Sequence, residues 1–580
     1  MFSTIPRRII QIGLILLVCL LPFESSAGLP LGGLVFNSIE LPAAVLSLIW
    51  IVLLIGERRM PDLPRWLLLL GISYSTAHLA AALVAPEYGR DALKFALRQT
   101  QAVIVGACLA EQIRHFGWPF ARTILLSLLA SGSLSAMLGL WELGEAPFVL
   151  DGLSIFKTQL SFVVGTLRLS GTFVYANVAA MFYEALLPLA IIAGVGILAG
   201  RWRLLGVIAT IVLLVAALLT YSRAALGVVI GLLLLIPLVV AWARRRPPLR
   251  LIGIVATAGL VLGGLPGLAP TIRLRLIEPE AVRWYGATYQ PTPLTQLAAA
   301  EQRSIAIRLT NTGVATWQAQ GARPVMLAYH WFDPRSGQAV IFDGIRTPLP
   351  YNIAPGESID ILANLQAPTV PGTYQLAWDL LLENGGGWFS QYQIDMPRMQ
   401  VEVIGTPTAQ QPSRPSDPAP HRTTIAPVTT DELPPPSRGL LWRAALSLWM
   451  QRPLLGIGPG VFQYVYGPVA GLSRWDTRIH TNNLYLELLV GGGVWVLFSF
   501  VLLIGQTLRK GMQYLRQHGA QSAGSGAWWG VLASMLGVVA FLLHGVLDAF
   551  IAFMTTNLLL WVLIGVVMGI TTQPLAKEQV

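Results

Sequence analysis

The chain has 580 residues, of which 54% are hydrophobic and 12% charged, and its formal net charge is +10. So large an apolar fraction excludes an ordinary soluble protein, because that much apolar surface needs lipid to face. We therefore expect an integral membrane protein, and a basic balance in such a chain is no reason to expect a nucleic-acid partner. The two cysteines, Cys19 and Cys108, fall inside apolar runs, so the sequence offers no disulfide framework or cysteine-based metal site.

Twelve apolar runs of about 20 residues are long enough to cross roughly 30 Å of bilayer hydrocarbon as helices. The sequence thus predicts an all-α polytopic membrane domain of about twelve spans. The first run could instead belong to a cleaved signal peptide, since two arginines precede it, but eleven further spans leave little need for one. The runs lie near residues 9–25, 39–56, 66–84, 96–111, 120–141, 175–198, 204–221, 224–242, 250–268, 486–507, 527–546 and 551–571.

The placement of lysine and arginine orients these spans, because basic residues are retained on the cytoplasmic side of a membrane. With the N-terminus inside, the inside segments carry seventeen basic residues and the short outside segments carry six. This predicts a multi-pass protein of the cytoplasmic (inner) membrane with both termini in the cytoplasm. It also predicts that residues 269–485 are extracytoplasmic.

Within that outer stretch the hydrophobic pattern changes to period-two alternation, as at Ile305 and Ile307. Short strands closed by turns such as Pro355 and Gly356 predict a β-sandwich, and the region resembles the Ig-like domains that bacteria append to surface proteins. Its aromatic residues could bind sugar rings, but core packing is the commoner use of aromatics that alternate along strands. Nine prolines among residues 406–437 then predict an extended linker.

The predicted organisation has five parts. Residues 1–270 form a membrane domain with spans one to nine, and residues 271–405 form an inserted extracytoplasmic Ig-like β-sandwich. Residues 406–437 are the Pro-rich linker. Residues 438–485 form an extracytoplasmic loop that is the candidate for catalysis, and residues 486–580 contain the last three spans.

Polar residues concentrate at the predicted outer ends of the spans, and the chain contains no P-loop and no Asp-x-Asp pair. The stretch RLSGTFVYAN, from Arg168 to Asn177, leads into a span that contains Glu184. Arg168 can reach toward lipid headgroups or bind a phosphate. Glu184 is either a functional residue or a structural one with a buried partner. Arg223, in the tight turn TYSRAALG, can grip a phosphate bidentately, although a turn between spans also tolerates one charge.

The stretch richest in polar groups and glycine is RPLLGIGPG at residues 452–460, followed by HTNNLYLE at residues 480–487. A near-neutral imidazole at His480 suits a group that orients or deprotonates an attacking hydroxyl, although the ring could also bond the start of the next helix. The candidates for substrate binding in this part of the chain are Arg452, Arg478, Asn482 and Asn483.

His544 and Asp548 stand near the predicted outer end of the eleventh span. A spacing of four residues puts them on one face of a helix, where an imidazole and a carboxylate can pair. Such a pair could be structural or part of a substrate site, and the sequence leaves both uses open.

Together, RLSGTF with Asn177, TYSRAA, RPLLGIGPG and HTNNLYLE resemble the O-antigen ligase and Wzy-type polysaccharide polymerase family over residues 160–265 and 438–572. The resemblance implies a GT-C-like helical fold and a glycosyltransferase that needs no metal or other cofactor. It also implies a donor glycan carried on undecaprenyl diphosphate and a glycan, lipid or protein acceptor. Whether the enzyme is a polymerase or a ligase stays open.

Family members usually carry His-Asn directly before Leu-Tyr-Leu. In this chain Asn482 stands in the histidine position, and the nearest imidazole is His480, two residues earlier. We expect His480 to act on the acceptor hydroxyl, with Arg223 and Arg168 stabilising charge on the departing diphosphate.

Two other functional classes remain open. One is a polytopic transporter or flippase of lipid-linked glycans, which would show internal repeats or broken helices near the bilayer midplane. The other is a membrane anchor that displays an adhesive Ig-like module, which would leave the motifs on both sides of the module unexplained.

Overall fold

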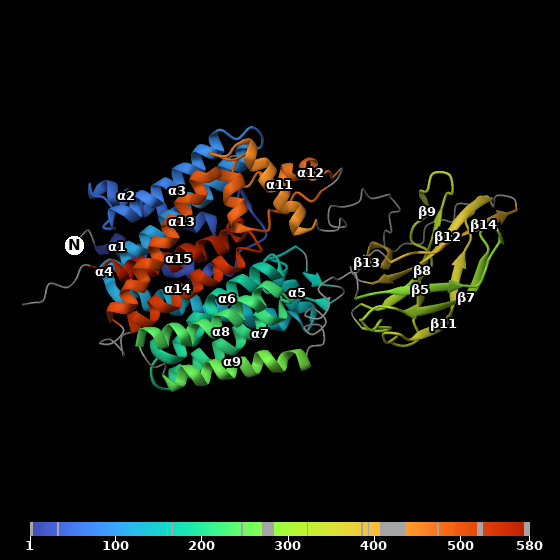
Figure 1. The fold of residues 1–580 in the computed structure, drawn as a ribbon, viewed down its shortest axis with the longest axis horizontal. Helices are drawn as coiled ribbons and strands as arrows, with labels where there is room; N and C mark the ends of the chain where they lie inside the picture. Colours follow the sequence, from blue (N-terminus) through green and yellow to red (C-terminus); the bar gives the residue numbers. More distant parts are fainter. Residues whose placement is uncertain are drawn as a thin grey trace, which may run out of the picture. The chain divides into compact units, whose positions relative to one another are not determined.

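The computed structural model separates the chain into two units, a helical one and a β-rich one (Figure 1). The helical unit combines residues 1–161, 168–268 and 430–580, so segments from both sides of the β-rich insertion build one membrane domain. The β-rich unit comprises residues 162–167 and 269–429. The structure describes residues 4–31, 34–158, 160–163, 166–244, 248–268, 284–321, 323–383, 387–392, 394–405, 436–472, 475–518 and 526–573.

The helical unit consists of helices joined by loops and one small hairpin, and a second small hairpin belongs to the β-rich unit. The first half contains α1 (Thr4–Leu20), α2 (Glu40–Gly56), α3 (Arg65–Leu83), α4 (Gly89–Glu142), α5 (Pro147–Leu153), α6 (Ala176–Ile192) with a π-helical turn (Ala193–Ile197), a 3-10 turn (Gly200–Trp202), α7 (Arg203–Leu219), α8 (Arg223–Arg244) and α9 (Leu249–Leu268). The hairpin of the helical unit is β1 (Leu29–Leu31) with β2 (Leu34–Phe36), and that of the β-rich unit is β3 (Phe162–Val163) with β4 (Thr166–Leu167). The second half contains α11 (Arg438–Gln451), α12 (Phe462–Val469), α13 (Leu484–His518), α14 (Gly526–His544), the 3-10 turn η6 (Phe550–Ala552) and α15 (Met554–Thr571).

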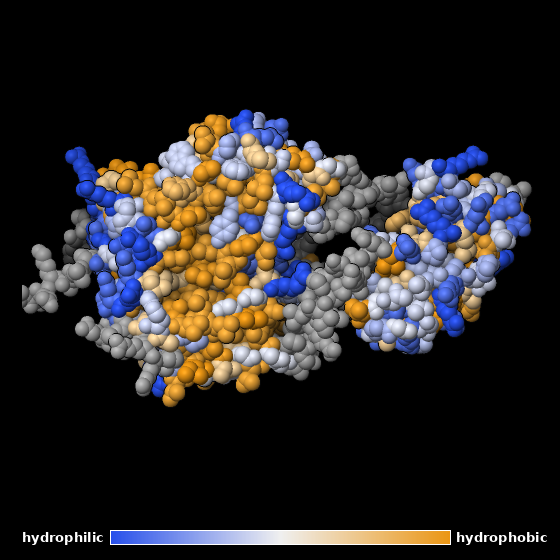
Figure 2. All heavy atoms as spheres, viewed as in Figure 1, coloured by the Kyte–Doolittle hydropathy of each residue, from blue (hydrophilic) through white to orange (hydrophobic). Residues whose placement is uncertain are grey.

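Among the described residues, eight helices are long and apolar enough to cross a membrane, which confirms a multi-pass membrane protein. The predicted number of about twelve spans is not confirmed. Each predicted run overlaps a helix, but the fourth and fifth runs share α4, which is broken at Gly117 (φ 68°). In addition α1, α2 and the apolar part of α9 are shorter than eighteen residues. Figure 2 shows the apolar surface of the helical unit across its middle, with hydrophilic residues at both ends.

Two helices form the buried centre of the helical unit. Every residue of α6 except Asn177 is buried, and α15 is buried from Met554 to Ile570. Small residues let α15 approach the first half of α4, because a Cβ added at Gly565 would lie 2.8 Å from the carbonyl oxygen of Gly106. Polar side chains on α6 and in the first turn of α15 are therefore buried inside the protein and do not face lipid.

Apart from the β3–β4 hairpin, the described part of the β-rich unit contains two sheets. Strands β5, β7, β11 and β14 alternate buried and exposed residues, as predicted, whereas β8 and β12 are buried over most of their length. In one sheet the strand order is β10-β8-β12-β14-β6, with β9 on β8 and β13 on β12, and in the other it is β11-β7-β5. Among the described strands, all pairings are antiparallel except that of β14 with β6. The strands are β5 (Ala287–Pro291), β6 (Gln296–Ala298), β7 (Gln302–Asn311), β8 (Val325–Phe332), β9 (Ala339–Ile341), β10 (Thr347–Pro348), β11 (Ser358–Gln366), β12 (Gly372–Leu382), β13 (Gly387–Trp388) and β14 (Arg398–Ile404).

The large aromatic residues of this unit pack inside it. The side chains of Trp317, Trp331 and Trp378 are fully buried, so these indoles contribute to the core. The Ig-like character of the unit stays a prediction. The predicted linker lies outside the described residues up to residue 435, and residues 269–283 lie outside them as well.

Candidate functional site

A buried ion pair holds the loop that follows α5. The ammonium of Lys157 donates to the carboxylate of Glu142 at the end of α4 and, at 2.7 Å, to the hydroxyl of Ser170. The second oxygen of Glu142 accepts the backbone N–H groups of Gly171 (2.6 Å) and Ser170 (3.2 Å). Since a buried pair is stable only when its remaining hydrogen-bonding groups are also satisfied, these bonds fix the turn directly after Arg168.

Arg168 joins this loop to the end of α7. Its Nε donates to the carbonyl of Thr220 at 2.7 Å, and the backbone N–H of Leu169 donates to Leu219 at 3.0 Å. The structure thus brings together the predicted motifs RLSGTF and TYSRAA. Arg223 begins α8 three residues after Thr220 and is exposed, and it makes no hydrogen bond or ion pair in the part of the chain that the structure describes.

Asn177 extends the contacts of Arg168 to the far end of the chain. In the first turn of α6, its side-chain oxygen accepts from Nη2 of Arg168 at 2.7 Å, and its Nδ2 donates to a carboxylate oxygen of Asp548 at 3.2 Å. Asp548 lies in the segment between α14 and η6, where its other oxygen accepts the N–H of Ala549 at 2.9 Å. Three of the predicted site residues therefore form one hydrogen-bonded chain.

His480 pairs with a carboxylate that the sequence analysis did not select. Its Nδ1 lies 3.1 Å from Glu487, in the first turn of α13, and the other oxygen of Glu487 accepts the N–H of Thr481 at 3.1 Å. Burial by itself lowers the pKa of His480, but the negative charges of Glu487 and Asp548 outweigh it and hold that pKa above the usual 6.5. A signal for Glu487 was present, because it is an acidic residue at the start of an otherwise apolar helix.

Aromatic rings connect His480 with the start of α6. The ring of Phe553 lies 6.4 Å from that of His480 and 5.2 Å from that of Tyr175, both edge-on. Burial and the carboxylates of Asp548 and Asp476 raise the pKa of Tyr175 well above its usual value, although Arg478 acts in the opposite direction. His480, Asn177 and Asp548 thus belong to one region, which we call the polar cluster together with Arg168, Arg223 and Glu487.

The predicted pairing of His544 with Asp548 on one helix face is wrong. α14 ends at His544 and the next three residues form a turn, so the two side chains do not share a helical face. Instead Nδ1 of His544 lies 2.6 Å from Glu184 on α6, and both side chains are buried. Glu184 therefore has the buried structural partner that was one of its two expected uses.

The two asparagines before α13 have different surroundings. Asn482 has φ 50°, a left-handed conformation that asparagine tolerates better than most residues. Asn483 donates to the carbonyl of Val546 and accepts the N–H of Leu486, each at 2.9 Å, so its amide caps α13 and ties it to the end of α14. Backbone geometry and helix capping thus explain why asparagine suits these two positions.

Two further predicted arginines contact other parts of the protein. Arg452 donates from Nη1 to the carbonyl of Val84 at 2.9 Å, at the end of α3. Arg478 forms a two-pronged ion pair with Asp476, with contacts of 2.8 and 2.9 Å. Arg478 lies near Tyr175, whereas Arg452 anchors the start of the glycine-rich loop.

The glycine-rich loop of residues 453–460 supports the break in α13. Its backbone bonds that of α13, with Ile457 donating to Val490 (2.9 Å) and Gly458 to Gly491 (3.1 Å). At the break itself, Gly493 has φ 67°, and an added Cβ would lie 2.2 Å from Leu454. The loop therefore fixes the first segment of α13, which carries Glu487, by close backbone contact.

These features define a multi-pass membrane protein with a cluster of arginine, asparagine, aspartate and histidine side chains where α6, α8 and α13 begin. Residues 428–501 match the family model described as O-antigen ligase, so over this segment the chain is similar to that family. The matched segment contains His480, Glu487, the glycine-rich loop and the break in α13.

The other two comparisons add no functional information. No curated protein matches the chain. One solved structure that aligns is Pseudomonas fluorescens alkylpurine DNA glycosylase AlkC bound to DNA containing an abasic site analog, at 11% identity over 58% of this chain and 97% of that one. Its TM-score of 0.14 is too low to support an argument about fold or function.

Proposed function

We propose that the protein is a membrane glycosyltransferase of the O-antigen ligase or polymerase type, with a GT-C-like helical domain. It takes a glycan from undecaprenyl diphosphate at the outer side of the cytoplasmic membrane and transfers it to a glycan, lipid or protein acceptor. The family match at residues 428–501 supports the class, and the polar cluster is the observation that carries the proposal. In this arrangement both termini are cytoplasmic and residues 269–485 are extracytoplasmic.

Arg223 is the residue best suited to the diphosphate. Its guanidinium is exposed and makes no hydrogen bond or ion pair within the described residues, whereas Arg168 is bonded to Thr220 and Asn177. A guanidinium presents a planar set of donors that matches phosphate oxygens. Fixed donors at a site of developing negative charge contribute about 100-fold to 1000-fold each in enzymes.

His480 is the residue best suited to the acceptor. When its Nδ1 donates to Glu487, the neutral ring keeps a lone pair on Nε2 for a hydroxyl proton. In the proposed step the acceptor oxygen attacks the anomeric carbon, forming the new glycosidic bond while the bond to the diphosphate oxygen breaks. Undecaprenyl diphosphate leaves with the bonding electrons, and the proton moves to Nε2 of His480.

Transport or flipping of lipid-linked glycans is the second candidate, and the break in α13 is the observation that favours it. Against it, the glycine-rich loop fills that break with direct backbone hydrogen bonds.

Reconstitution tests the proposed reaction. In liposomes with a lipid-diphosphate oligosaccharide and a candidate acceptor, the wild-type protein is expected to form a longer or transferred glycan. Arg223→Ala is expected to lower the transfer rate by about 100-fold or more. Arg90→Ala, which removes an exposed arginine at the start of α4, is the matched control and should leave the rate unchanged. Equal rates for both variants would remove Arg223 from the mechanism.

A further inference from the structure

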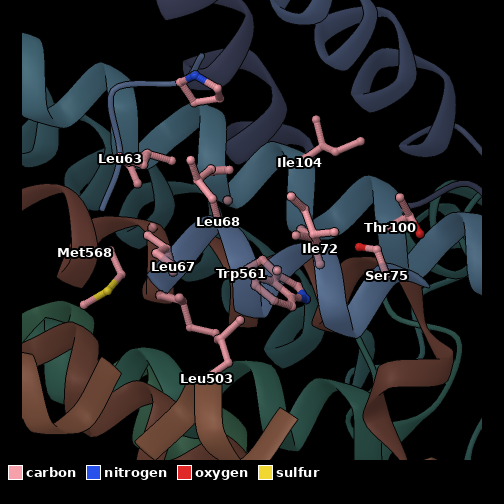
Figure 3. A pocket seen from close by; sticks show the side chains of 18 of the residues that line it. Leu63, Leu67, Leu68, Ile72, Ser75, Thr100, Ile104, Leu503, Trp561 and Met568 are labelled. Carbon is pink, nitrogen blue, oxygen red and sulfur yellow. The ribbon is translucent and has the colours of Figure 1, made fainter. Parts of the chain in front are cut away.

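A long apolar groove opens on the membrane-facing side of the helical unit, away from the polar cluster. Its cavity has a volume of about 360 Å³, and its walls come from α2, α3, α4, α13 and α15. Figure 3 shows Leu67, Leu68 and Ile72 of α3 along the groove, with Trp561 and Met568 of α15 and Leu503 of α13 around it. Residues at its edge face outward, since Ile72 is 53% exposed.

Small residues hollow out the floor of this groove. Gly71, Gly106, Ala107, Ala110 and Gly565 all line it, and they leave space where larger side chains would stand. At Gly106 and Gly565 the backbones of α4 and α15 are in close contact. The two helices therefore cannot change their separation without losing this packing. The groove is therefore a fixed feature of how these helices pack.

The groove presents almost no polar atoms to an occupant. The hydroxyl of Thr76 donates to the carbonyl of Ile72 at 2.8 Å, and that of Thr100 donates to Ala96 at 2.9 Å. Both hydroxyls are thus satisfied by their own helices, as is common for threonine in membrane helices. A hydrocarbon chain matches such a wall, because it requires no hydrogen bond.

The length of the groove matches one leaflet of a bilayer. It extends along α3 from Leu67 to Thr76, nine helical steps or about 14 Å at 1.5 Å per residue. That is close to half of the roughly 30 Å of hydrocarbon in a membrane. One lipid chain entering from the surface at the Leu67 end would therefore fill it.

Cationic residues flank the surface end of the groove. The segment Met60 to Leu63 lines that end, and Arg58 and Arg65 flank this segment in the sequence. Both arginines are exposed, and neither has a hydrogen-bond or ion-pair partner for its side chain among the residues described. Uncommitted guanidinium groups beside a hydrocarbon groove suit a lipid with a negatively charged headgroup.

A buried carboxylate holds this end in place. Glu111 of α4 is fully buried and accepts from Arg59 (2.5 Å), from the backbone N–H of Asp62 (2.8 Å) and from the indole of Trp50 (2.7 Å). These bonds tie the segment between α2 and α3 to α4. The two flanking arginines therefore sit on a segment that is anchored to the floor of the groove.

We propose that this groove binds one acyl chain of an anionic phospholipid, whose phosphate is held by Arg58 and Arg65. By the distribution of basic residues, the lipid belongs to the cytoplasmic leaflet. The site is separate from the polar cluster and does not depend on the proposed glycosyl transfer.

Native mass spectrometry of the full chain, purified in detergent, tests this site. We expect added phosphatidylglycerol to stay bound to the wild-type protein in preference to phosphatidylethanolamine with the same chains. Ala107→Phe, which fills the groove from α4, should abolish that retention, and Thr76→Phe should do the same from α3. Leu69→Phe, on the exposed side of α3 outside the lining, should retain the lipid like the wild-type protein.

The headgroup contact is tested separately. Arg58→Gln and Arg65→Gln should each weaken the preference for phosphatidylglycerol, by about fivefold per arginine. Arg122→Gln with Arg250→Gln, which removes two other exposed arginines expected on the same side, should leave that preference unchanged. A thermal unfolding transition like that of the wild-type protein identifies variants that are folded.

Three results would overturn the proposal. One is equal retention of the two phospholipids by the wild-type protein, and another is full retention by both folded groove-filling variants. The third is undecaprenyl phosphate displacing phosphatidylglycerol from the wild-type protein but not binding to Ala107→Phe. That pattern would assign the groove to an isoprenoid chain instead of a phospholipid.

Discussion

Two carboxylates, those of Asp548 and Glu487, act on the other side chains of the polar cluster. Asp548 bonds Asn177 and also raises the pKa of His480, so one carboxylate acts on both the arginine side and the histidine side of the cluster. Glu487 holds the imidazole through its Nδ1. A base in this position is expected to be stabilised in its protonated form once it has taken a proton.

The pH dependence of glycosyl transfer should reveal the pKa of His480. A general base must be neutral to act, so the transfer rate should rise with pH through the pKa of His480, which lies above 6.5. Glu487→Gln removes the nearest negative charge, which lowers that pKa and moves the rise in rate to lower pH. Rate profiles of the two proteins from pH 5 to pH 9 would show the shift. A rise that stays in place in Glu487→Gln would mean that another group titrates.

At the scale of elements, the ends of helices were harder to predict than their existence. The apolar runs predicted the helices, because lipid requires long apolar segments. The pairing of His544 with Asp548 failed because α14 stops at His544. Gly545 follows directly, where a Cβ would lie 2.9 Å from Leu484 on α13. That contact joins segments some sixty residues apart, and spacing along one helix cannot reveal it.

The site itself was predictable in its residue types and only partly in its contacts. Arg168, Asn177 and Asp548 do come together, although nothing in the sequence shows that α6 lies beside the segment after α14. The carboxylates Glu487 and Glu184, which hold the two histidines, depend on the same helix packing. Pairing between distant helices is thus the part that residue patterns leave undetermined.

The loop between α5 and α6 should depend on its buried ion pair. Removing one partner leaves the other charge buried, so Glu142→Ala is expected to lower the free energy of unfolding by about 3 kcal/mol. Thermal unfolding in detergent would show this as a lower melting temperature. Glu142→Leu combined with Lys157→Met removes both charges and should recover part of the loss. A single variant as stable as the wild-type protein would mean that the pair does not hold the loop.

At the scale of the whole molecule, the chain is a membrane domain interrupted by a separate β-rich unit. The described strands of that unit from β5 to β14 pair only with each other, and its tryptophans are buried within it. A region of this size with its own core has what an independently folding domain needs. The membrane domain, in contrast, requires the segments on both sides of the insertion.

Independent folding of the β-rich unit is directly testable. Residues 284–405, produced alone, should be soluble and unfold in one cooperative transition. Because Trp317, Trp331 and Trp378 are buried, their fluorescence should shift to longer wavelength as the fragment unfolds. A fragment with exposed tryptophans and no transition would show that this unit requires the rest of the chain.

The polar cluster is proposed to perform glycosyl transfer, with His480 as the base. The most direct test is the single-turnover transfer rate of His480→Ala, with donor binding measured on the same protein. We predict a loss of at least about 100-fold in the rate, with binding of the lipid-diphosphate donor retained. Transfer by a folded His480→Ala protein at the wild-type rate would contradict the account.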